Sequence, residues 1–266
     1  MVIAIDFVVC IKQVPRTGEV EVDPETGNLV RGGVASQTNP YDLYALEAAL
    51  SLREQLGGTV TALSMGPPQA EMAVREALWM GADRAVLLSD AAFAGSDTLA
   101  TAYTLSRALS RMPFDLVLAG MQTTDGDTAQ VGPGLAELLG IPCASYVREL
   151  LDVDDRRVRV VVDLGGDEAV LELDLPCLLT VTRDLNQPRL PSLRRRLATE
   201  DQAIPVYGRA DLEDGGQGDR FGLQGSPTRV ERVFPPEPKG TRETWTGEGR
   251  ELGQRLGARL KELRFL

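Results

Sequence analysis

The residues best suited to chemistry lie between Gly120 and Pro133, in the stretch GMQTTDGDTAQVGP. It follows an apolar run at residues 114–119 and precedes an apolar-periodic run at residues 135–139, so it is predicted to join a strand to a helix. It holds three glycines, three threonines and two acidic residues, and no Lys, Arg or His. This composition suits a loop that binds a ligand through backbone amides and short polar side chains. A phosphate at a helix N-terminus needs little more than free N–H groups and the positive end of the helix dipole.

The loop lacks the Gly-Lys-Ser/Thr ending of a P-loop and does not read GxGxxG. Asp127 is predicted to cap a helix that begins near residue 128, which leaves the amides of Thr128, Ala129 and Gln130 free for a pyrophosphate. Pro133 falls in the early turns of that helix, where it removes an internal hydrogen bond and predicts a kink. In the alternative interpretation, Asp127 only caps its helix and the glycines only turn the chain.

Two further charged groups have more than one interpretation. Asp125 and Asp127 are a carboxylate pair of the kind that binds Mg²⁺, but a turn residue and a helix cap explain them equally well, and no metal is assigned. Lys12 follows the first predicted strand, where it either faces a phosphate or extends along the surface as an ordinary lysine.

The elements around this loop alternate between strand and helix. Apolar runs predict strands at residues 3–11, 59–65, 84–88 and 114–119. Helical patterns follow at residues 43–56, 69–80, 97–112 and 128–139, with Thr38 or Asn39 as a cap before Pro40 and with Ser96 or Asp97 as a second cap. A small hairpin is predicted at residues 19–31 around the turn PETG. The alternation predicts an α/β fold, a parallel sheet flanked by helices with right-handed crossovers.

Ligands of such sheets bind outside the carboxyl ends of the strands. Four segments are expected to meet there: residues 10–14, 39–42, 64–67 and 120–131. The pattern changes after Gly140, where four strand-like runs predict an antiparallel extension at the far edge of the sheet. These runs lie at residues 143–147, 158–163, 169–173 and 177–182.

The domain boundary is predicted after residue 183, where regular structure becomes sparse. Residues 209–220 have the composition of a linker, and a last helix is expected at residues 248–263. Because residues 184–266 contain too little apolar sequence for a core of their own, we expect an arm that docks on another subunit, or else a tail that packs on its own domain.

Composition excludes several classes of function. The net charge of −11 and the pI near 4.7 argue against nucleic-acid binding, which relies on clustered Lys and Arg. The absence of histidine excludes a His base, a Ser-His or Cys-His pair and a His metal ligand. The three cysteines form no CxxC pair, as expected of reduced residues in the cytoplasm. No run is long enough to span a bilayer.

The sequence resembles the β subunit of electron-transfer flavoproteins. The resemblance is carried, in the family's order, by VVCIKQVP (8–15), NPYDLYALEAAL (39–50), MGPPQAE (65–71), REALWMGAD (75–83), GMQTTDGDTAQVGP (120–133), LNQPRLPSL (185–193) and FGLQGSPTRVERVFPP (221–236). It implies a Rossmann-like, adenine-nucleotide-binding domain at residues 1–183. It also implies that residues 184–266 form a partner-recognition loop and a C-terminal arm that wraps an α subunit.

The resemblance also implies a site for FAD or AMP. Together with Lys12, the candidate cofactor-binding residues are Cys10, Asn39, Pro40, Tyr41, Asp42, Met65, Gly120, Met121, Gln122, Thr123, Thr124, Asp125, Gly126, Asp127, Thr128, Ala129, Gln130 and Val131. The candidate partner-binding residues are Leu193, as an anchor, and Arg194, Arg195 and Arg196. No side chain is assigned a catalytic role.

Two subtypes of this family differ in what the β subunit holds. Conventional members carry a structural AMP beside a single α-subunit FAD, and electron-bifurcating members carry a second FAD that NADH reduces. The loop here resembles the second subtype, because Ala129 and Val131 are smaller than the residues that conventional members have there. In that subtype, one electron passes through the α-subunit FAD towards an acyl-CoA-type or other flavin dehydrogenase, and the other reaches ferredoxin or flavodoxin. Met121 departs from the family by replacing a usual Arg or Lys.

Overall fold

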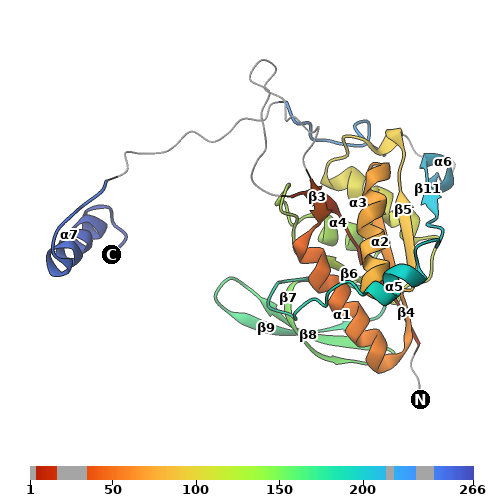
Figure 1. Cartoon of the computed structure of the whole chain (residues 1–266), viewed down its shortest axis with the longest axis horizontal. Helices are drawn as coiled ribbons and strands as arrows, with labels where there is room; N and C mark the ends of the chain where they lie inside the picture. The colour runs from red at the N-terminus through yellow and green to blue at the C-terminus, as the bar shows by residue number, and fades with distance from the viewer. Residues whose placement is uncertain (1–3, 17–34, 214–218, 232–242) are drawn as a thin grey trace. The chain divides into compact units, whose positions relative to one another are not determined.

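The computed structural model describes residues 4–16, 35–213, 219–231 and 243–266. The chain divides into two compact units, Met1–Glu231 and Arg232–Leu266. The first unit contains a large sheet with helices on both faces (Figure 1). Its strands are β1 (Ile5–Cys10), β2 (Gln13–Pro15), β3 (Ser36–Thr38), β4 (Gly58–Met65), β5 (Arg84–Leu88), β6 (Leu116–Gly120), β7 (Cys143–Val153), β8 (Arg157–Asp163), β9 (Glu168–Asp174), β10 (Cys177–Val181) and β11 (Val206–Tyr207). Its helices are α1 (Pro40–Leu56), α2 (Glu71–Met80), α3 (Thr98–Leu109), α4 (Val131–Leu139), α5 (Leu193–Ala198) and α6 (Arg209–Leu212), with 3₁₀ turns at Pro68–Ala70 and Ala91–Phe93.

The large sheet has the strand order β11-β5-β4-β1-β6-β10-β7-β8-β9. All pairs from β11 to β7 are parallel, and β7, β8 and β9 pair antiparallel. The carboxyl ends of β1, β4 and β6 therefore meet at one edge of the sheet, next to the loop that leads from β6 to α4. The fold class predicted from the sequence is confirmed.

The central strand β1 explains why the sheet is covered on both faces. Phe7, Val8 and Val9 are all fully buried. Phe7 and Val9 pack in the cluster that includes α1 and α2, whereas Val8 packs in the cluster that includes α3 and α4. A continuous apolar run is what a parallel strand between two helical layers requires. Burying each such side chain stabilises the fold by about 1.5–3 kcal/mol.

One predicted strand has a different place from the one expected. Residues 177–182 were expected in the antiparallel extension, but β10 lies between β6 and β7 and is parallel to both. All five residues of β10 are buried, so this strand has no face that suits an exposed edge. The antiparallel extension therefore consists of β7, β8 and β9.

The first unit continues beyond residue 183. β11 extends the sheet by pairing with β5, and α6 occupies residues that were expected to form a linker. Leu212 is fully buried, and the Phe221 ring lies 5.2 Å from the Tyr103 ring of α3. These parts of the C-terminal region pack on the unit that contains the large sheet. The assignment of residues 184–266 to an arm on another subunit stays a prediction.

The second unit contains α7 (Gly249–Glu262), close to the helix expected at residues 248–263. No residue of α7 is buried, and Leu256, Leu263 and Phe265 expose about half or more of their surface. The Arg255 guanidinium lies 4.7 Å from the Trp245 ring centroid within the same unit. The hairpin predicted at residues 19–31 lies outside the described residues.

Candidate nucleotide-binding site

The carboxylate of Asp42 joins three segments at the carboxyl edge of the sheet. Asp42 lies in the first turn of α1 and is only 4% exposed. Its Oδ2 accepts the Lys12 amide at 2.7 Å, and its Oδ1 accepts Asn39 Nδ2 at 2.8 Å and the Gly120 amide at 3.2 Å. Burial raises the pKa of Asp42 to about 7, although these hydrogen bonds favour the charged form. A single buried carboxyl group thus fixes the chain after β1, before α1 and at the end of β6.

Asn39 holds the loop that follows β6. Its Nδ2 donates to the Gln122 carbonyl at 2.9 Å, and its Oδ1 accepts the Thr124 amide at 3.3 Å. Asn39 occupies the N-cap position of α1, with Pro40 next to it, but its side chain makes no capping hydrogen bond. The predicted N-cap position of Asn39 is therefore confirmed, but without a side-chain capping bond, and the alternative cap Thr38 instead bonds to Glu76 of α2.

The end of β6 requires glycine. A Cβ atom added at Gly120 would lie 2.5 Å from Asp42 Oδ1 and 2.7 Å from the Cβ atom of Tyr41. Contacts this short leave no room for a side chain. The close approach lets the Gly120 amide reach Asp42, so the Gly120 position is set by α1 as well as by the sheet.

Lys12 forms an ion pair with Asp125. The Lys12 Nζ atom lies 2.8 Å from both carboxylate oxygens of Asp125, and the two side chains are 45% and 31% exposed. Burial opposes ionisation of Asp125, but its hydrogen bonds, chiefly from Lys12, lower its pKa overall. The ammonium group thus contacts the loop itself, and the prediction that Lys12 faces a phosphate stays a prediction.

The helix after the loop starts later than predicted. Asp127 has φ 51° and Ala129 has φ 55°, so neither is helical, and α4 begins at Val131 with Gln130 as its N-cap residue. Asp127 therefore does not cap this helix. Pro133 is the third residue of α4, where a backbone N–H has no partner within the helix, so the proline removes no internal hydrogen bond and the predicted reason for a kink is absent.

The amides of Thr128, Ala129 and Gln130 nevertheless face no protein acceptor within the described part of the chain. The side chain of Gln130 accepts a hydrogen bond from Thr98 Oγ1 at 3.0 Å, which links the loop to the start of α3. Positive φ at a non-glycine residue is energetically unfavourable and is enriched at functional sites. Three successive amides without a protein acceptor, next to Asp127 and including Ala129, fit an anionic group such as a pyrophosphate.

The ends of the neighbouring strands β1 and β4 complete this edge. Burial, followed by the nearby Asp42 carboxyl, raises the pKa of the Cys10 thiol to about 12, so Cys10 is no thiolate nucleophile near neutral pH. Ser64, next to Met65, is fully buried, and its hydroxyl has no hydrogen-bond partner among the described residues. Ser64 lay within the segment expected at this edge but was not selected as a site residue. An orphaned hydroxyl here is a feature that a ligand or an ordered water would satisfy.

The predicted site residues therefore gather at one edge. Hydrogen bonds and one ion pair join Lys12, Asn39, Asp42, Gly120, Gln122, Thr124 and Asp125, and Tyr41 packs against Gly120. The Met121 amide donates to the Val181 carbonyl of β10 at 2.9 Å. Thr123 accepts the Asp127 amide through its carbonyl and the Gly126 amide through its hydroxyl. The described residues contain no group of three or more side chains suited to a metal ion, and none of their helices is long and apolar enough to cross a membrane.

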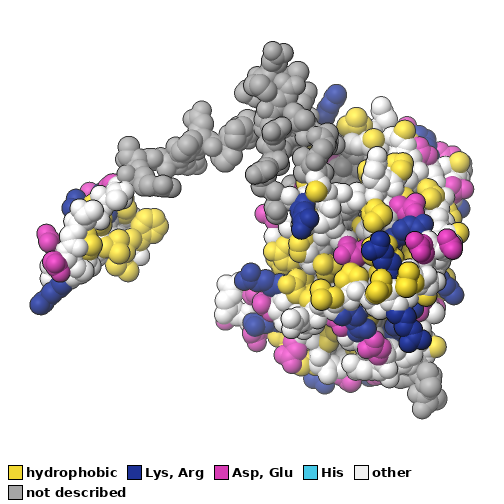
Figure 2. Space-filling model, viewed as in Figure 1, with side chains coloured by type: hydrophobic (Ala, Val, Ile, Leu, Met, Phe, Trp, Pro, Cys, Tyr) yellow, Lys and Arg dark blue, Asp and Glu magenta, His cyan; other side chains and the backbone are white. Residues whose placement is uncertain are grey.

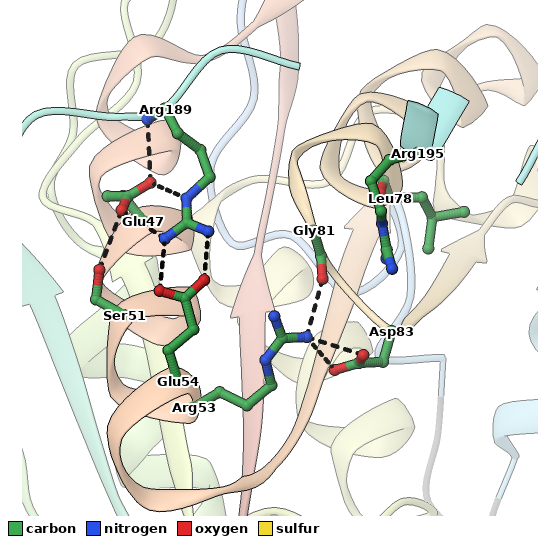
Figure 3. A network of polar contacts seen from close by, with 9 residues as sticks. All are labelled: Glu47, Ser51, Arg53, Glu54, Leu78, Gly81, Asp83, Arg189 and Arg195. Carbon is green, nitrogen blue, oxygen red and sulfur yellow. Dashed lines mark hydrogen bonds and ion pairs between the residues drawn. The ribbon is translucent and has the colours of Figure 1, made fainter. Parts of the chain in front are cut away.

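The predicted partner residues lie elsewhere in the first unit, on the segment that carries α5. Leu193 is 70% exposed and Arg194 is also exposed. Arg195 instead donates to the Leu78 carbonyl at 3.2 Å (Figure 3), and the Arg196 guanidinium lies 4.9 Å from the Trp79 ring centroid. Arg189, which the sequence gave no reason to select, forms the larger ion-pair network of this region (Figure 3).

The parallel sheet and the amide-rich loop at its carboxyl edge define a Rossmann-like α/β protein with a candidate nucleotide site. Comparison with known sequences makes this more specific, because residues 26–211 match the electron transfer flavoprotein domain family. The chain belongs to the electron transfer flavoprotein family, as the motifs of its sequence indicated.

Curated relatives match over nearly the whole chain. The electron transfer flavoprotein subunit beta of Clostridium acetobutylicum is 43% identical over 262 residues, which cover 98% of this chain and 100% of the relative. Subunit CarD of the caffeyl-CoA reductase-Etf complex of Acetobacterium woodii is 44% identical over 259 residues, covering 96% and 98%. The protein FixA of Azotobacter vinelandii is 45% identical over 243 residues, covering 88% and 85%.

Proposed function

We propose that this electron-transfer flavoprotein subunit binds FAD at the carboxyl edge of its sheet, pairs with an α subunit and takes part in NADH-driven electron bifurcation. The observation that carries the proposal is the row of unbonded amides at Thr128, Ala129 and Gln130 beside the small side chains of Ala129 and Val131. The amides suit a pyrophosphate, and the small side chains leave room beside it for the flavin half of the dinucleotide.

The residues of the chain would hold and orient the cofactor. The Thr128–Gln130 amides bind phosphate oxygens, and the positive end of the α4 dipole favours the same negative charge. Asn39 and Asp42 hold the loop in place, because their side chains form hydrogen bonds with Gln122, Thr124 and Gly120. Lys12 adds a positive charge that Asp125 partly neutralises.

Bound FAD would supply the redox chemistry, accepting a hydride from NADH and passing on single electrons. The protein then needs no side chain as acid, base or nucleophile. The high pKa of Cys10 agrees with this, since a thiol at this edge stays protonated and does not attack the cofactor.

The names of relatives support the wider assembly. CarD is named as a subunit of a complex with a caffeyl-CoA reductase, and the Clostridium relative is named as a β subunit. We infer for this chain a heterodimer with an α subunit, a flavin dehydrogenase as one electron acceptor, ferredoxin or flavodoxin as the other, and a cytoplasmic location. Exposed Leu193 and Arg194 are proposed to contact the dehydrogenase.

The decisive experiment is to co-purify the chain with its α subunit, denature the complex and quantify the released nucleotides. Two FAD molecules per heterodimer are expected, and NADH should bleach both flavin absorbances. One FAD and one AMP would overturn the proposal in favour of the conventional subtype, in which this subunit holds AMP as a structural ligand. ATP turnover without flavin would overturn both.

A further inference from the structure

In the segment from Leu185 to Thr199, leucine side chains are exposed and arginine side chains contact the neighbouring helices, which is the reverse of the usual arrangement. Three leucines of the segment face solvent: Leu190 is 87% exposed, Leu193 is 70% exposed and Leu197 is 65% exposed. Its arginines Arg189 and Arg195 instead contact the helices beneath. Figure 2 shows hydrophobic side chains on the surface around α5, interleaved with charged ones. An exposed apolar group of this kind marks an interaction site more often than scattered single leucines do.

Arg189 attaches the segment to α1. Its Nε and Nη2 atoms contact the two carboxylate oxygens of Glu47 at 2.8 and 2.9 Å, its backbone amide donates to Glu47 at 3.0 Å, and its Nη1 atom lies 2.5 Å from Glu54 (Figure 3). The Glu47 side chain is only 10% exposed and also accepts a hydrogen bond from Ser51. Hydrogen bonds with Glu47 and Glu54 raise the pKa of the Arg189 guanidinium. Burial alone would raise the pKa of Glu47, but its hydrogen bonds with Arg189 lower that pKa overall. A bidentate contact of this kind fixes the orientation of the Arg189 side chain as well as its position.

Arg195 attaches the other end of the segment to α2. Its guanidinium donates to the carbonyl of Leu78, in the last turn of that helix, and to the carbonyl of Ala82, two residues after the helix ends. The Ser192 amide donates to the Trp79 carbonyl at 2.9 Å, so the backbone is held there as well. A cation at a helix C-terminus satisfies carbonyls that have no partner within the helix.

We propose that Arg189 and Arg195 are positioning residues that keep this segment in one conformation and turn Leu190, Leu193 and Leu197 outward as one preformed apolar surface. The occupant of that surface is a partner flavin dehydrogenase with an apolar cleft bordered by carboxylates, since exposed Arg194 lies beside the leucines. The identity of the partner rests on the proposed function. The positioning role of Arg189 and Arg195 goes beyond the proposed function. It also gives Arg195 a role inside the chain, in place of the partner contact expected from the sequence.

Preformation has a measurable consequence. A loop that is ordered before binding does not have to lose conformational entropy at the interface, so its affinity is higher without any new contact. Loss of Arg189 should weaken docking although Arg189 itself need not touch the partner. The turnover rate of the docked complex should stay the same.

The test uses the purified heterodimer with Arg189→Met, Arg189→Lys and Arg195→Met. Arg157→Met is the matched control, because Arg157 forms an exposed 2.5 Å ion pair with Glu172 on β8 and β9. Amide hydrogen exchange is followed at residues 185–199. Electron transfer is measured against the concentration of an acyl-CoA dehydrogenase that exchanges electrons with the wild-type heterodimer.

We expect exchange at Ser192 and Thr199 to quicken at least about tenfold in Arg189→Met and Arg195→Met, with the apparent KM for the dehydrogenase rising about three- to tenfold and kcat unchanged. Arg189→Lys should lie between Arg189→Met and the wild type, and Arg157→Met should match the wild type. Unchanged exchange at residues 185–199 in both methionine variants would overturn the inference. Faster exchange with an unchanged KM would leave the positioning role intact but overturn the docking surface, and Leu193→Ala with wild-type KM would overturn the proposed partner contact separately.

Discussion

The Gly120 amide donates to Asp42 Oδ1 at 3.2 Å, and a Cβ atom at Gly120 would lie 2.5 Å from that same oxygen. The hydrogen bond and the steric limit are two consequences of one close approach between β6 and the first turn of α1. Since Asp42 also holds Lys12 and Asn39, this approach sets the geometry of the whole candidate site. The loop after β6 is thus positioned by a buried carboxyl group.

Gly120→Ala should destabilise the protein and release its nucleotide. The added methyl group must displace Asp42 or Tyr41, and overpacking of this kind costs about 1–3 kcal/mol. Gly126→Ala is the control, because it lies in the same loop and its added Cβ atom would be 3.4 Å from Thr123 Oγ1. Urea unfolding and nucleotide content of the heterodimer provide the measurement. Equal effects of the two substitutions would contradict the steric explanation.

The stability of the protein should fall as pH rises from about 4 to 7, through Asp42. The buried carboxyl has its pKa raised from 3.8 to about 7, so between these values the folded state keeps a proton that the unfolded state has lost. The Asp42 contribution to the unfolding free energy then falls by up to about 1.4 kcal/mol per pH unit and levels off above pH 7.

Asp42→Asn isolates this effect, because the variant cannot titrate. The difference in unfolding free energy between wild type and variant should decline with pH between about 4 and 7, although the variant also loses an acceptor for the Lys12 amide. Cys10 stays protonated throughout, and the lowered pKa of Asp125 places its titration below this range. A difference that does not change with pH would show that Asp42 ionises normally.

Ala129→Gly should stabilise the protein. Ala129 has φ 55°, a conformation that costs an L-residue about 1–2 kcal/mol, whereas glycine adopts it freely. After the extra entropy of glycine in the unfolded chain is subtracted, a gain of about 0.5–1 kcal/mol is expected. Ala136→Gly in α4 is the matched control and should destabilise, since Ala136 is buried in a helix. If both substitutions destabilise to the same degree, Ala129 is not strained.

Much of this site was accessible from the sequence, and the part that was not depends on long-range contacts. The composition of residues 120–133 indicated a loop that binds through amides, and the strand periodicity brought Cys10, Asn39 and Gly120 to one edge of the sheet. The helix start was wrong because Asp127 and Ala129 adopt positive φ without being glycine, which no local pattern signals. Asp42 could be listed as a site residue, but its partners Lys12 and Gly120 lie 30 and 78 residues away.

In the fold, too, features set by local sequence were predicted, and features set by long-range contacts were missed. Strands with continuous apolar runs were predicted close to their observed bounds, yet β10 was assigned to the wrong part of the sheet because its acidic flanking turns resemble those of the antiparallel strands. The unbroken apolar sequence of β10, CLLTV, was the signal for a buried parallel strand. Arg189 was missed because its partner Glu47 is 142 residues away, and neither residue is unusual in its own segment.

Asp97 performs two roles that substitution should separate. Its Oδ1 accepts the amides of Leu99 and Ala100 at the start of α3, while its Oδ2 accepts the amide and the hydroxyl of Thr228 at 3.0 and 2.8 Å. Asp97→Ala loses the cap and should cost about 1 kcal/mol or more of unfolding free energy. Asp97→Asn keeps an oxygen for the cap but puts an NH₂ group against the Thr228 amide.

Both variants should therefore speed amide exchange at Thr228, and only Asp97→Ala should lower the urea midpoint strongly. The neighbouring Thr98 contacts Gln130, so the released segment lies next to the candidate site. Slow exchange at Thr228 in Asp97→Asn would show that the Ser226 hydroxyl, which accepts the Asp97 amide at 2.9 Å, is sufficient to hold the segment.

Removal of the second unit should separate folding from assembly. A chain that ends at Glu231 retains the first compact unit, whereas α7 buries no residue, and Leu256 of α7 and Leu263 and Phe265 after it are exposed. The truncated chain is therefore expected to unfold at the same urea concentration as the full chain and to fail to co-purify with the α subunit. In the full-length chain, Leu256→Glu should weaken assembly at least tenfold, and Gln254→Glu on the same helix should not. If the truncated chain assembles normally, α7 is not part of the docked arm, and exposed Leu256 and Leu263 need another partner.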